Sequence, residues 1–466
     1  MKKGKKEKLV EHKEIKGMFD GKILPVLLKL TLPMMFGMFF QLFYNVTDTF
    51  WISLIDKKDP SYVGGTGMIF PLFVFVMALA NGIVIGVNSL VARAIGERNH
   101  RILEKAAESG LVIGIFFGIA LLILGYLYDR DIIATLGASE LYMTRALDYY
   151  RFILPLVPVI LFGAVFQGIL QGEGLMKYVM KAMIIATVLN IVLDPVFIFL
   201  LDLKVKGAAL ATCLSHSTGV FYTLSVFHMK KSSIHVKWKL ANIDLHTMGK
   251  ISSIGFTQAA SMIIMSLSFM FINRIVIHID KLAMTAYSLA ARIDQIIFIP
   301  IFAIGSAVLT MVGQNSARGL YDRTKEIWYR GIQGAAIMVL FLAAVMFILA
   351  RIIYSNFSEI DQVVNYAVTQ TRILAFTYIF ATVGILGRSV FQGTGHPFPA
   401  LVLAFLRMII LNVPAILVLV YVFNLKMYGV WFGLIIGNST TAIISLIWVR
   451  SSLNKLKSGE LKVIPT

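Results

Sequence analysis

Acidic residues and cysteine are scarce in this sequence. Its 466 residues include 25 Asp and Glu against 43 Lys and Arg, and a single cysteine, Cys213. One cysteine excludes an intrachain disulfide and leaves the redox compartment open. The sequence also lacks an aspartate-rich DDxxD loop, a cluster of metal ligands and a nucleophile constellation. We therefore expect that the protein is not an enzyme, in particular not an intramembrane prenyl transferase, and that it needs no cofactor.

Long apolar runs dominate the rest of the sequence. Hydrophobic residues make up 58% of the chain, whereas soluble domains contain roughly 45–50%. A membrane-spanning helix needs about 20 largely apolar residues, and runs that are continuous rather than alternating favour helices over a barrel. The sequence therefore predicts an all-α polytopic membrane protein with twelve transmembrane helices. The approximate windows of these helices are 27–54, 62–92, 106–128, 146–170, 178–201, 206–228, 249–276, 282–311, 330–353, 366–390, 398–423 and 427–449.

Alternate gaps between the apolar runs are rich in basic residues, for example 93–105, 230–239 and 318–325, and the intervening gaps contain fewer. The net charge of +18 alone could indicate nucleic acid, but cytoplasmic loops concentrate Lys and Arg in this alternating way. We expect a multi-pass protein of the cell membrane with both termini in the cytoplasm and no nucleic-acid partner. The basic loops would contact anionic membrane lipids. The first apolar run exceeds the roughly 7–15 residues of a signal-peptide core, which predicts an uncleaved span.

The second half of the chain repeats features of the first. The tetrapeptide QGEG at 171–174 recurs as QGTG at 392–395, and each leads into a span that carries Asn190 or Asn412. An even number of spans per half gives both halves the same orientation, so we expect two six-helix bundles related by pseudo-two-fold symmetry about the membrane normal. The predicted parts are a cytoplasmic basic tail at 1–26, an N-terminal lobe at 27–228, a cytoplasmic linker at 229–248, a C-terminal lobe at 249–450 and a cytoplasmic tail at 451–466.

The first predicted span carries one carboxylate, Asp48, in the otherwise apolar run 31–53. An acid at bilayer depth is costly, and it usually faces a cavity or a partner on an ion or proton pathway. Gln41, Asn45 and Asp48 follow at spacings of four and three, and Tyr44 precedes Asp48 by four, so all of them share one helix face. For Gln41 and Asn45 alone, a hydrogen-bond seam between helices is the alternative. The carboxylate favours a functional site.

The fifth predicted span also has a single charged residue, Asp194, with Asn190 four residues earlier on the same face. Pro195 follows at once and has no N–H, so the carbonyl of Ile191 loses its helical partner and can bind a cation or water. A simple kink at Pro195 is the alternative, and both can hold together. If both helices start inside, Asp48 and Asp194 each lie roughly 10 Å from the outer surface.

Thr212 enters the next span at a similar depth. We expect Asp48, Asn190, Asp194 and Thr212 to converge as an ion-coupling site, whose oxygens suit a proton or Na⁺. Two carboxylates in a poorly hydrated site cannot easily both ionise, and they should titrate as a unit. No other metal is predicted.

The second half has no matching acid, because the repeat offset pairs Asp194 with Ile416. Its spans instead carry Arg292, Asp294, Arg388 and Arg407. We expect these groups to be snorkelling side chains or structural charges between helices.

Methionines on the acid-bearing helices, Met38 and Met183, could line a pliable chamber for varied lipophilic ligands, with ordinary packing as the alternative. The predicted substrate-binding residues are Met38, Gln41, Tyr44, Asn45 and Met183, and the predicted hinges are Pro33 and Pro195.

Taken together, these motifs resemble the multidrug and toxic compound extrusion (MATE) family of twelve-helix, cation-coupled exporters. The resemblance covers nearly the whole chain. Within the family, the sequence is similar to the prokaryotic DinF-like branch. Its carriers are Pro33, Gln41, Tyr44, Asn45, Asp48, Phe50 and Trp51, then Asn190, Asp194 and Pro195, then GAALAT at 207–212, and Gly313, Gln314 and Asn315.

The resemblance implies that the N-lobe acid pair, Asp48 and Asp194, couples transport to a proton or sodium ion, with Asn190 and Thr212 as companions. The NorM-type branch uses acids of the C-terminal lobe, and Ala381 stands where its tenth-helix Asp is expected.

We therefore predict a secondary active antiporter, acting as a monomer, that exports lipophilic cationic organic compounds against inward H⁺ or Na⁺. One alternative is a flippase of a related superfamily for lipid-linked sugars or polar lipids, which more naturally carries extra helices and basic cavity residues. A scaffold or receptor is the other alternative.

Overall fold

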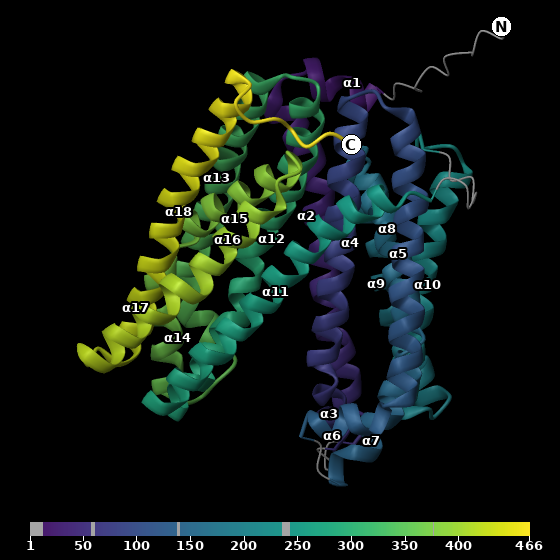
Figure 1. The fold of residues 1–466 in the computed structure, drawn as a ribbon. Coiled ribbons are helices and arrows are strands. Elements are labelled where there is room, and N and C mark those ends of the chain that lie inside the picture. The colour runs from purple at the N-terminus through teal and green to yellow at the C-terminus, as the bar shows by residue number, and fades with distance from the viewer. Residues whose placement is uncertain (1–12, 57–60, 138–139, 235–242, 376) are drawn as a thin grey trace, which may run out of the picture. The chain divides into compact units, whose positions relative to one another are not determined.

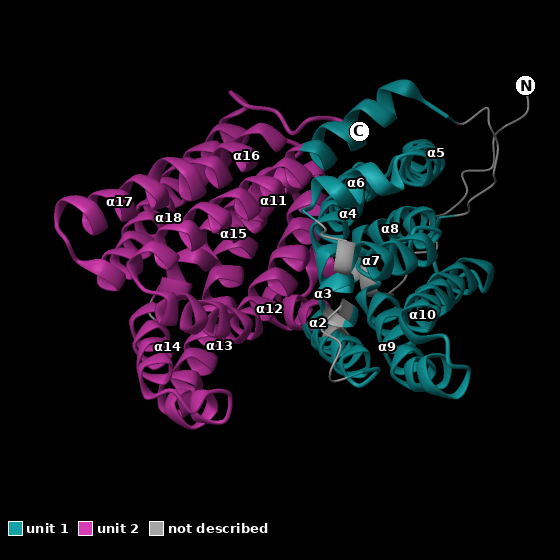
Figure 2. Ribbon diagram, turned by 90° about the horizontal axis from the view of Figure 1, so that it is seen from below, with its two compact units in different colours: residues 1–17, 32–256, 466 teal, residues 18–31, 257–465 magenta. Residues whose placement is uncertain are grey.

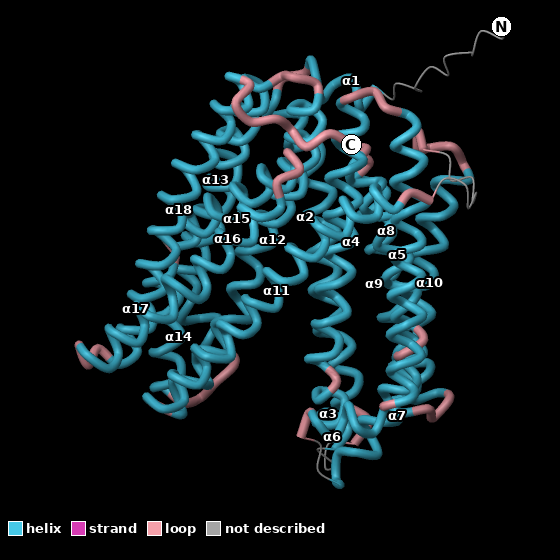
Figure 3. Tube along the Cα trace, viewed as in Figure 1, coloured by secondary structure: helices cyan, strands magenta, loops and turns pink. Residues whose placement is uncertain are grey.

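The computed structural model describes residues 13–56, 61–137, 140–234, 243–375 and 377–466. These residues fold into helices joined by short connections, and they contain no strand (Figure 3). This confirms the predicted all-α class.

Nine helices within the described residues are long and apolar enough to cross a membrane. Two further pairs of helices pass the same test together but are bent, by 43° and 56°. The nine are α2 (Ile23–Ser53), α4 (Phe70–Gly96), α5 (His100–Leu127), α9 with η1 (Met176–Leu200), α11 (Leu245–Ile279), α12 (Lys281–Ala317), α13 (Tyr321–Ser355), α16 through η4 (Pro397–Val422) and α18 (Lys426–Ser458) (Figure 1).

The bent pairs correspond to two predicted spans that we expected to be continuous. They join α7 (Glu140–Ile153) to α8 (Leu156–Gly172) and α14 (Asp361–Leu374) to α15 (Thr377–Gly393). A further helix, α10 (Lys204–His228), has the length of a span but a more polar composition. With it, the described residues contain a helix or a bent helix pair in each of the twelve predicted windows.

Short helices lie between or within the spans. They are α1 (Lys13–Asp20), α3 (Ser61–Met68), α6 (Asp129–Thr135), the π-helices η1 (Val196–Leu200), η3 (Leu406–Asn412) and η4 (Val418–Val422), and α17 (Val413–Leu417). Side-chain caps fix some starts: Asn99 accepts a hydrogen bond from the backbone N–H of Ile102 at α5, and Asp280 accepts one from Leu282 at α12.

The chain divides into two compact units (Figure 2). Unit 1 comprises Met1–Gly17, Leu32–Phe256 and Thr466, and unit 2 comprises Met18–Thr31 and Thr257–Pro465. The first turns of α2 therefore group with unit 2 and the remainder with unit 1. The division falls directly before Pro33, which lies inside α2.

The sequence repeat corresponds to a matched helix end in each unit. Gly174 after α8 and Gly395 after α15 have positive φ angles of 78° and 84°. Leu175 then bonds back to the carbonyl of Leu170 at 2.7 Å, and His396 bonds back to Phe391 at 2.8 Å. Glycine tolerates this conformation without a Cβ clash, so each tetrapeptide ends its helix in the same way.

The same repeat places a close helix contact inside each unit. In unit 1, a Cβ at Gly172 would lie 3.0 Å from the carbonyl oxygen of Asn88 and 2.7 Å from Val91. In unit 2, a Cβ at Gly393 would lie 2.8 Å from the carbonyl oxygen of Leu309. The partners are offset by the same interval as the glycines. The predicted duplication is thus visible in the packing of α8 on α4 and of α15 on α12.

Candidate functional site

The middle of α2 packs tightly against α9 in unit 1. A Cβ at Gly37 would lie 2.7 Å from the sulfur of Met183 and 3.3 Å from the Cα of Met180. Glycine at this position lets the two helices approach, and Met183 fills the contact. Met183 therefore packs against α2, which fits the alternative of ordinary packing. Met38 is half-buried on α2.

One hydrogen bond joins α2 to α10. The hydroxyl of Tyr44 donates to Oγ1 of Thr212 at 3.2 Å, and the two side chains are 8% and 1% exposed. The ring of His216 meets Tyr44 edge-on, with centroids 5.6 Å apart. Thr212 is thereby held on the face of α10 that meets the polar stripe of α2.

A second hydrogen bond joins two residues that lie one helical turn apart on α9. Nδ2 of Asn190 donates to Oδ1 of Asp194 at 3.1 Å, and both side chains are fully buried. The carboxylates of Asp194 and Asp48 are close enough to interact electrostatically, and Tyr44 interacts with both. The structure therefore brings Asp48, Asn190, Asp194 and Thr212 into one cluster.

Three oxygens of this cluster are buried and have no hydrogen-bond partner: Oδ1 of Asp48, Oδ1 of Asn190 and Oδ2 of Asp194. A buried polar atom without a partner costs free energy, which a bound proton or cation can offset. Among the described residues no group of three or more His, Cys, Asp or Glu could hold a metal. The oxygens available here come from two carboxylates and from neutral amide and hydroxyl groups.

The remaining predicted residues surround the cluster. Gln41 is half-buried on α2, and the side chain of Asn45 lies outside the described residues. Pro33 lies inside α2, which continues as a helix through it. Pro195 ends α9, and the chain then continues as the π-helix η1. This change of helix type fits the missing N–H of proline.

Two aromatic residues of the site were not predicted. Tyr149 of α7 interacts electrostatically with Asp48 and Asp194, and Trp51 packs with it against the buried side chains of Ile52, Ile198 and Ala208. The indole Nε1 of Trp51 is buried without a hydrogen-bond partner. The bend between α7 and α8 falls at Pro155, which is a signal in the sequence, but nothing in the pattern indicates that Tyr149 faces the cluster.

Unit 2 differs at the corresponding positions. Ile416, which the repeat pairs with Asp194, is fully buried, and its Cγ1 would lie 2.5 Å from a Cβ at Gly433. Asp294 on α12 accepts a short hydrogen bond from the hydroxyl of Tyr378 on α15. Asp294 therefore has an interhelical partner, in keeping with the predicted structural charge, whereas Arg292 is exposed.

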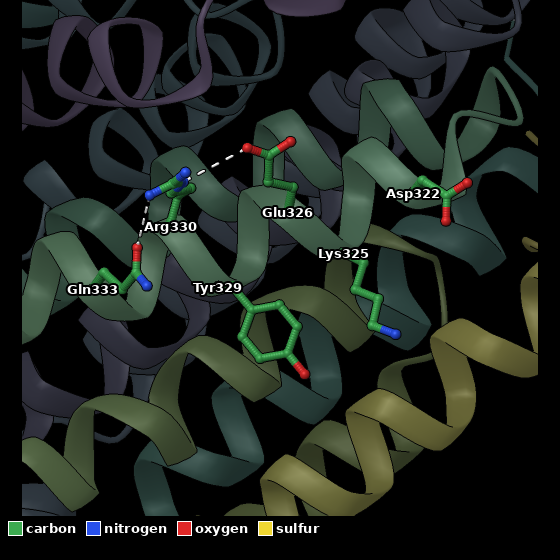
Figure 4. A pocket seen from close by; sticks show the side chains of 6 residues that line it. All are labelled: Asp322, Lys325, Glu326, Tyr329, Arg330 and Gln333. Atoms are coloured by element: carbon green, nitrogen blue, oxygen red, sulfur yellow. Dashed lines mark hydrogen bonds and ion pairs between the residues drawn. The ribbon is translucent and has the colours of Figure 1, made fainter.

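A surface pocket of unit 2 lies away from these groups, along the first turns of α13 (Figure 4). Glu326 and Arg330 form an ion pair at 3.6 Å across it, and Asp322 pairs with Lys457 of α18. Its lining contains none of the predicted site residues; it consists of Asp322, Lys325, Glu326, Tyr329, Arg330 and Gln333.

Two duplicated bundles of apolar helices, one of which encloses unpartnered carboxylate oxygens, define a membrane transporter. A family model described as MatE matches residues 33–196 and 258–418, which is more than half of the chain. The chain belongs to this MATE family of multidrug efflux transporters.

Known relatives agree over nearly the full length. Multidrug export protein MepA of Staphylococcus aureus (strain bovine RF122 / ET3-1) is 21% identical over 92% of this chain and 93% of its own. Probable multidrug resistance protein NorM of Thermotoga maritima is 24% identical over 91% and 92%.

Solved structures show the same fold. The MATE transporter ClbM in complex with Rb⁺ is 32% identical, with a TM-score of 0.85 over 96% of this chain and 100% of ClbM. An outward-facing multidrug resistance MATE transporter of the MOP superfamily is 26% identical, with a TM-score of 0.90 over 96% and 99%.

Proposed function

We propose that this protein is a secondary antiporter of the cell membrane that exports lipophilic organic compounds, cations among them, against inward H⁺ or Na⁺. The observation that carries the proposal is the pair Asp48 and Asp194, in which each carboxylate has one buried oxygen without a hydrogen-bond partner. The names of MepA and NorM, both multidrug proteins, support the substrate class.

The coupling ion would act by changing the charge of the cluster. With both carboxylates ionised, Asp48 on α2 and Asp194 on α9 repel each other. A proton or Na⁺ removes this repulsion and favours close packing of the two helices at Gly37 and Met183. Substrate and ion then need only bind different conformations of α2 to oppose each other through one equilibrium. Pro33 is the hinge we propose for that change.

The oxygen set is compatible with either ion. A proton needs one carboxylate oxygen, whereas Na⁺ needs several oxygens, which Asn190 and Thr212 can complete. The relative ClbM was solved in complex with Rb⁺, which supports a monovalent metal cation as one candidate.

The test is efflux of a fluorescent organic cation from proteoliposomes under separately imposed pH and Na⁺ gradients. We expect one gradient to drive efflux by the wild-type protein and Asp48→Asn to reduce driven efflux to passive leakage while the protein stays folded. Asp131→Asn, which removes an exposed carboxylate on α6, is the matched control and should transport normally. Undiminished coupled transport by Asp48→Asn would overturn the proposal.

We also propose that both termini face the cytoplasm, because basic residues fill the gaps on that side. Single cysteines introduced into a Cys213→Ser background, one in the 93–105 gap and one at Asp131, should label from opposite sides of intact cells. Labelling of both from the outside would contradict this topology.

A further inference from the structure

Two arginines in membrane-spanning segments of unit 2 are withdrawn from the surface and have no acidic partner among the described residues. Arg388 lies on α15 and Arg407 in the π-helix η3. Arg407 is 9% exposed, and Nε of Arg388 is buried without a hydrogen-bond partner. A charge at this depth is expensive, and it usually marks a functional site or has a partner.

The contacts of both guanidinium groups are to neutral atoms. Nη2 of Arg388 donates to Oε1 of Gln258 on α11 at 3.0 Å, and Nε2 of Gln392 donates to the same oxygen at 2.9 Å. Nη2 of Arg407 has only the sulfur of Met408, at 4.0 Å. A guanidinium has five N–H donors, so these contacts leave much of its capacity unused.

The two positive charges also act on each other. Arg388 and Arg407 are close enough to repel electrostatically, and no described carboxylate offsets this repulsion. Removing one partner from a buried ion pair typically costs several kcal/mol because it leaves an uncompensated charge. An anion between α15 and η3 would relieve both the repulsion and the missing hydrogen bonds.

The local backbone supports a binding role. The π-helical turn of η3 displaces Arg407 from a regular helical register, and such turns occur frequently at functional sites. The hydroxyl of Ser268 on α11 donates to the carbonyl of Met408 at 2.9 Å, which fixes η3 against α11. Snorkelling, which we expected from the sequence, would leave the charged end of Arg407 exposed near a helix end. The burial of Arg407, ten residues after the start of α16 at Pro397, does not fit that expectation.

We propose that Arg388 and Arg407 bind the carboxylate of a transported compound. The planar arginine fork matches a carboxylate in bidentate geometry, and it does so better than a lysine ammonium. The substrates of this protein would then include lipophilic zwitterions that carry a carboxylate as well as a cationic group. This inference rests on the proposed export function and narrows its substrate class.

A pair of dyes that differ in one group tests the inference. Rhodamine 110 carries a free carboxylate, and rhodamine 123 is its methyl ester. We expect purified wild-type protein in phosphatidylcholine nanodiscs to bind rhodamine 110 about tenfold more tightly than rhodamine 123. This is a difference in binding free energy of about 1.4 kcal/mol. Arg388→Gln and Arg407→Gln should each abolish this preference and change the affinity for rhodamine 123 by less than about twofold. Equal wild-type affinity for both dyes would overturn the inference.

Matched variants separate recognition from folding. Arg351→Gln, at an exposed arginine of α13, should keep the full preference. Arg388→Lys and Arg407→Lys keep the positive charge but lose the planar guanidinium. Each variant should therefore retain only part of the preference for rhodamine 110. If the glutamine variants do not fold, the lysine variants decide: a full preference with lysine at both positions contradicts bidentate recognition.

An anionic lipid headgroup offers similar oxygens and is tested in a separate arm. Phosphatidylglycerol added to the nanodiscs should weaken rhodamine 110 binding only mildly if the site belongs to substrate. Complete loss of the preference in that arm would assign the arginines to lipid and overturn the inference. These binding measurements use no gradient. Failure of gradient-driven rhodamine 123 efflux would therefore count against the proposed antiport, whereas equal affinity for the two dyes would count against the carboxylate site.

Discussion

The two units share a packing framework and differ in the charges placed on it. Gly172 against Asn88 in unit 1 and Gly393 against Leu309 in unit 2 are contacts of the same kind at the same interval. Charged positions do not follow this rule. Asp194 of unit 1 corresponds to the buried Ile416 of unit 2.

Basic groups show the converse difference. Arg388 of unit 2 corresponds by the repeat to the neutral Gln167 of unit 1. Helix packing depends on small residues at contact points, and those have stayed matched. The charged side chains have diverged, so that one unit contains carboxylate oxygens without a hydrogen-bond partner and the other contains guanidinium groups without a described acidic partner. A duplicated scaffold can thus supply one site for a cation and another for an anion.

The largest effect is expected when an acid is introduced into unit 2 at the position that corresponds to Asp194 of unit 1. Ile416→Asp would place a carboxylate against Gly433, where the native side chain is fully buried. We expect a loss of stability of several kcal/mol, because an unpaired charge would be buried. Thermal unfolding in detergent measures this, with Ile416→Val as the control that should cost about 1 kcal/mol. A normal melting temperature for Ile416→Asp would show that unit 2 can host an acid there.

The reverse change tests the role of Asp194 in unit 1. Asp194→Asn keeps the volume and an oxygen toward Asn190 but removes the charge that the coupling ion would neutralise. We expect gradient-driven efflux to fall by about 100-fold or more, the loss of roughly 2.7 kcal/mol of coupling, with little change in melting temperature. Asp294→Asn in unit 2 is the comparison, and it should retain driven efflux. Equal losses in the two variants would mean that the units contribute alike.

Much of the unit 1 site could be predicted from the sequence. Spacings of three and four placed Gln41, Tyr44 and Asp48 on one helix face, and matched depth predicted that Asp48 and Asp194 would meet. Both inferences depend only on helix geometry and membrane thickness, which are fixed by the backbone.

Other features depend on tertiary packing, and the sequence pattern did not reveal them. Tyr149 lies on α7, which meets α8 at a bend of 43°. Pro155 marks this bend in the sequence but does not show that Tyr149 faces the cluster. The π-helical register of Arg407 in η3 has no sequence signal apart from the nearby Pro414. The sequence alone indicates that Arg388 and Arg407 are structural charges, because the absence of an acidic partner is visible only in three dimensions.

A smaller effect should follow from the hydrogen bond between Tyr44 and Thr212, which has no described counterpart in unit 2. Tyr44→Phe and Thr212→Val should each lower stability by about 1 kcal/mol, the usual net value of one buried hydrogen bond. In a double-mutant cycle the combined loss should be less than the sum, because both changes remove the same bond. Strict additivity would show that the contact at 3.2 Å contributes nothing.

The smallest expected effect concerns an ion pair at the surface of unit 1, between the start of α6 and the end of α7. Nε of Arg151 lies 2.6 Å from Oδ2 of Asp129, and this hydrogen bond holds the pKa of Asp129 below its usual value. Because the folded pKa is lowered, the pair stabilises the protein above the unfolded pKa of about 3.9 and loses that contribution as the pH falls below it.

Arg151→Gln should therefore cost at most about 1 kcal/mol at neutral pH, reduced by salt, because the arginine is half-exposed. The difference from wild type should shrink as the pH falls below about 3.9. Melting temperatures across this pH range measure it, and a difference that grows on acidification would contradict the assigned sign. The effect of Arg151→Gln on stability should be small because the arginine of this pair is half-exposed to water. A carboxylate that binds the coupling ion, as we propose for Asp194, is instead withdrawn from water.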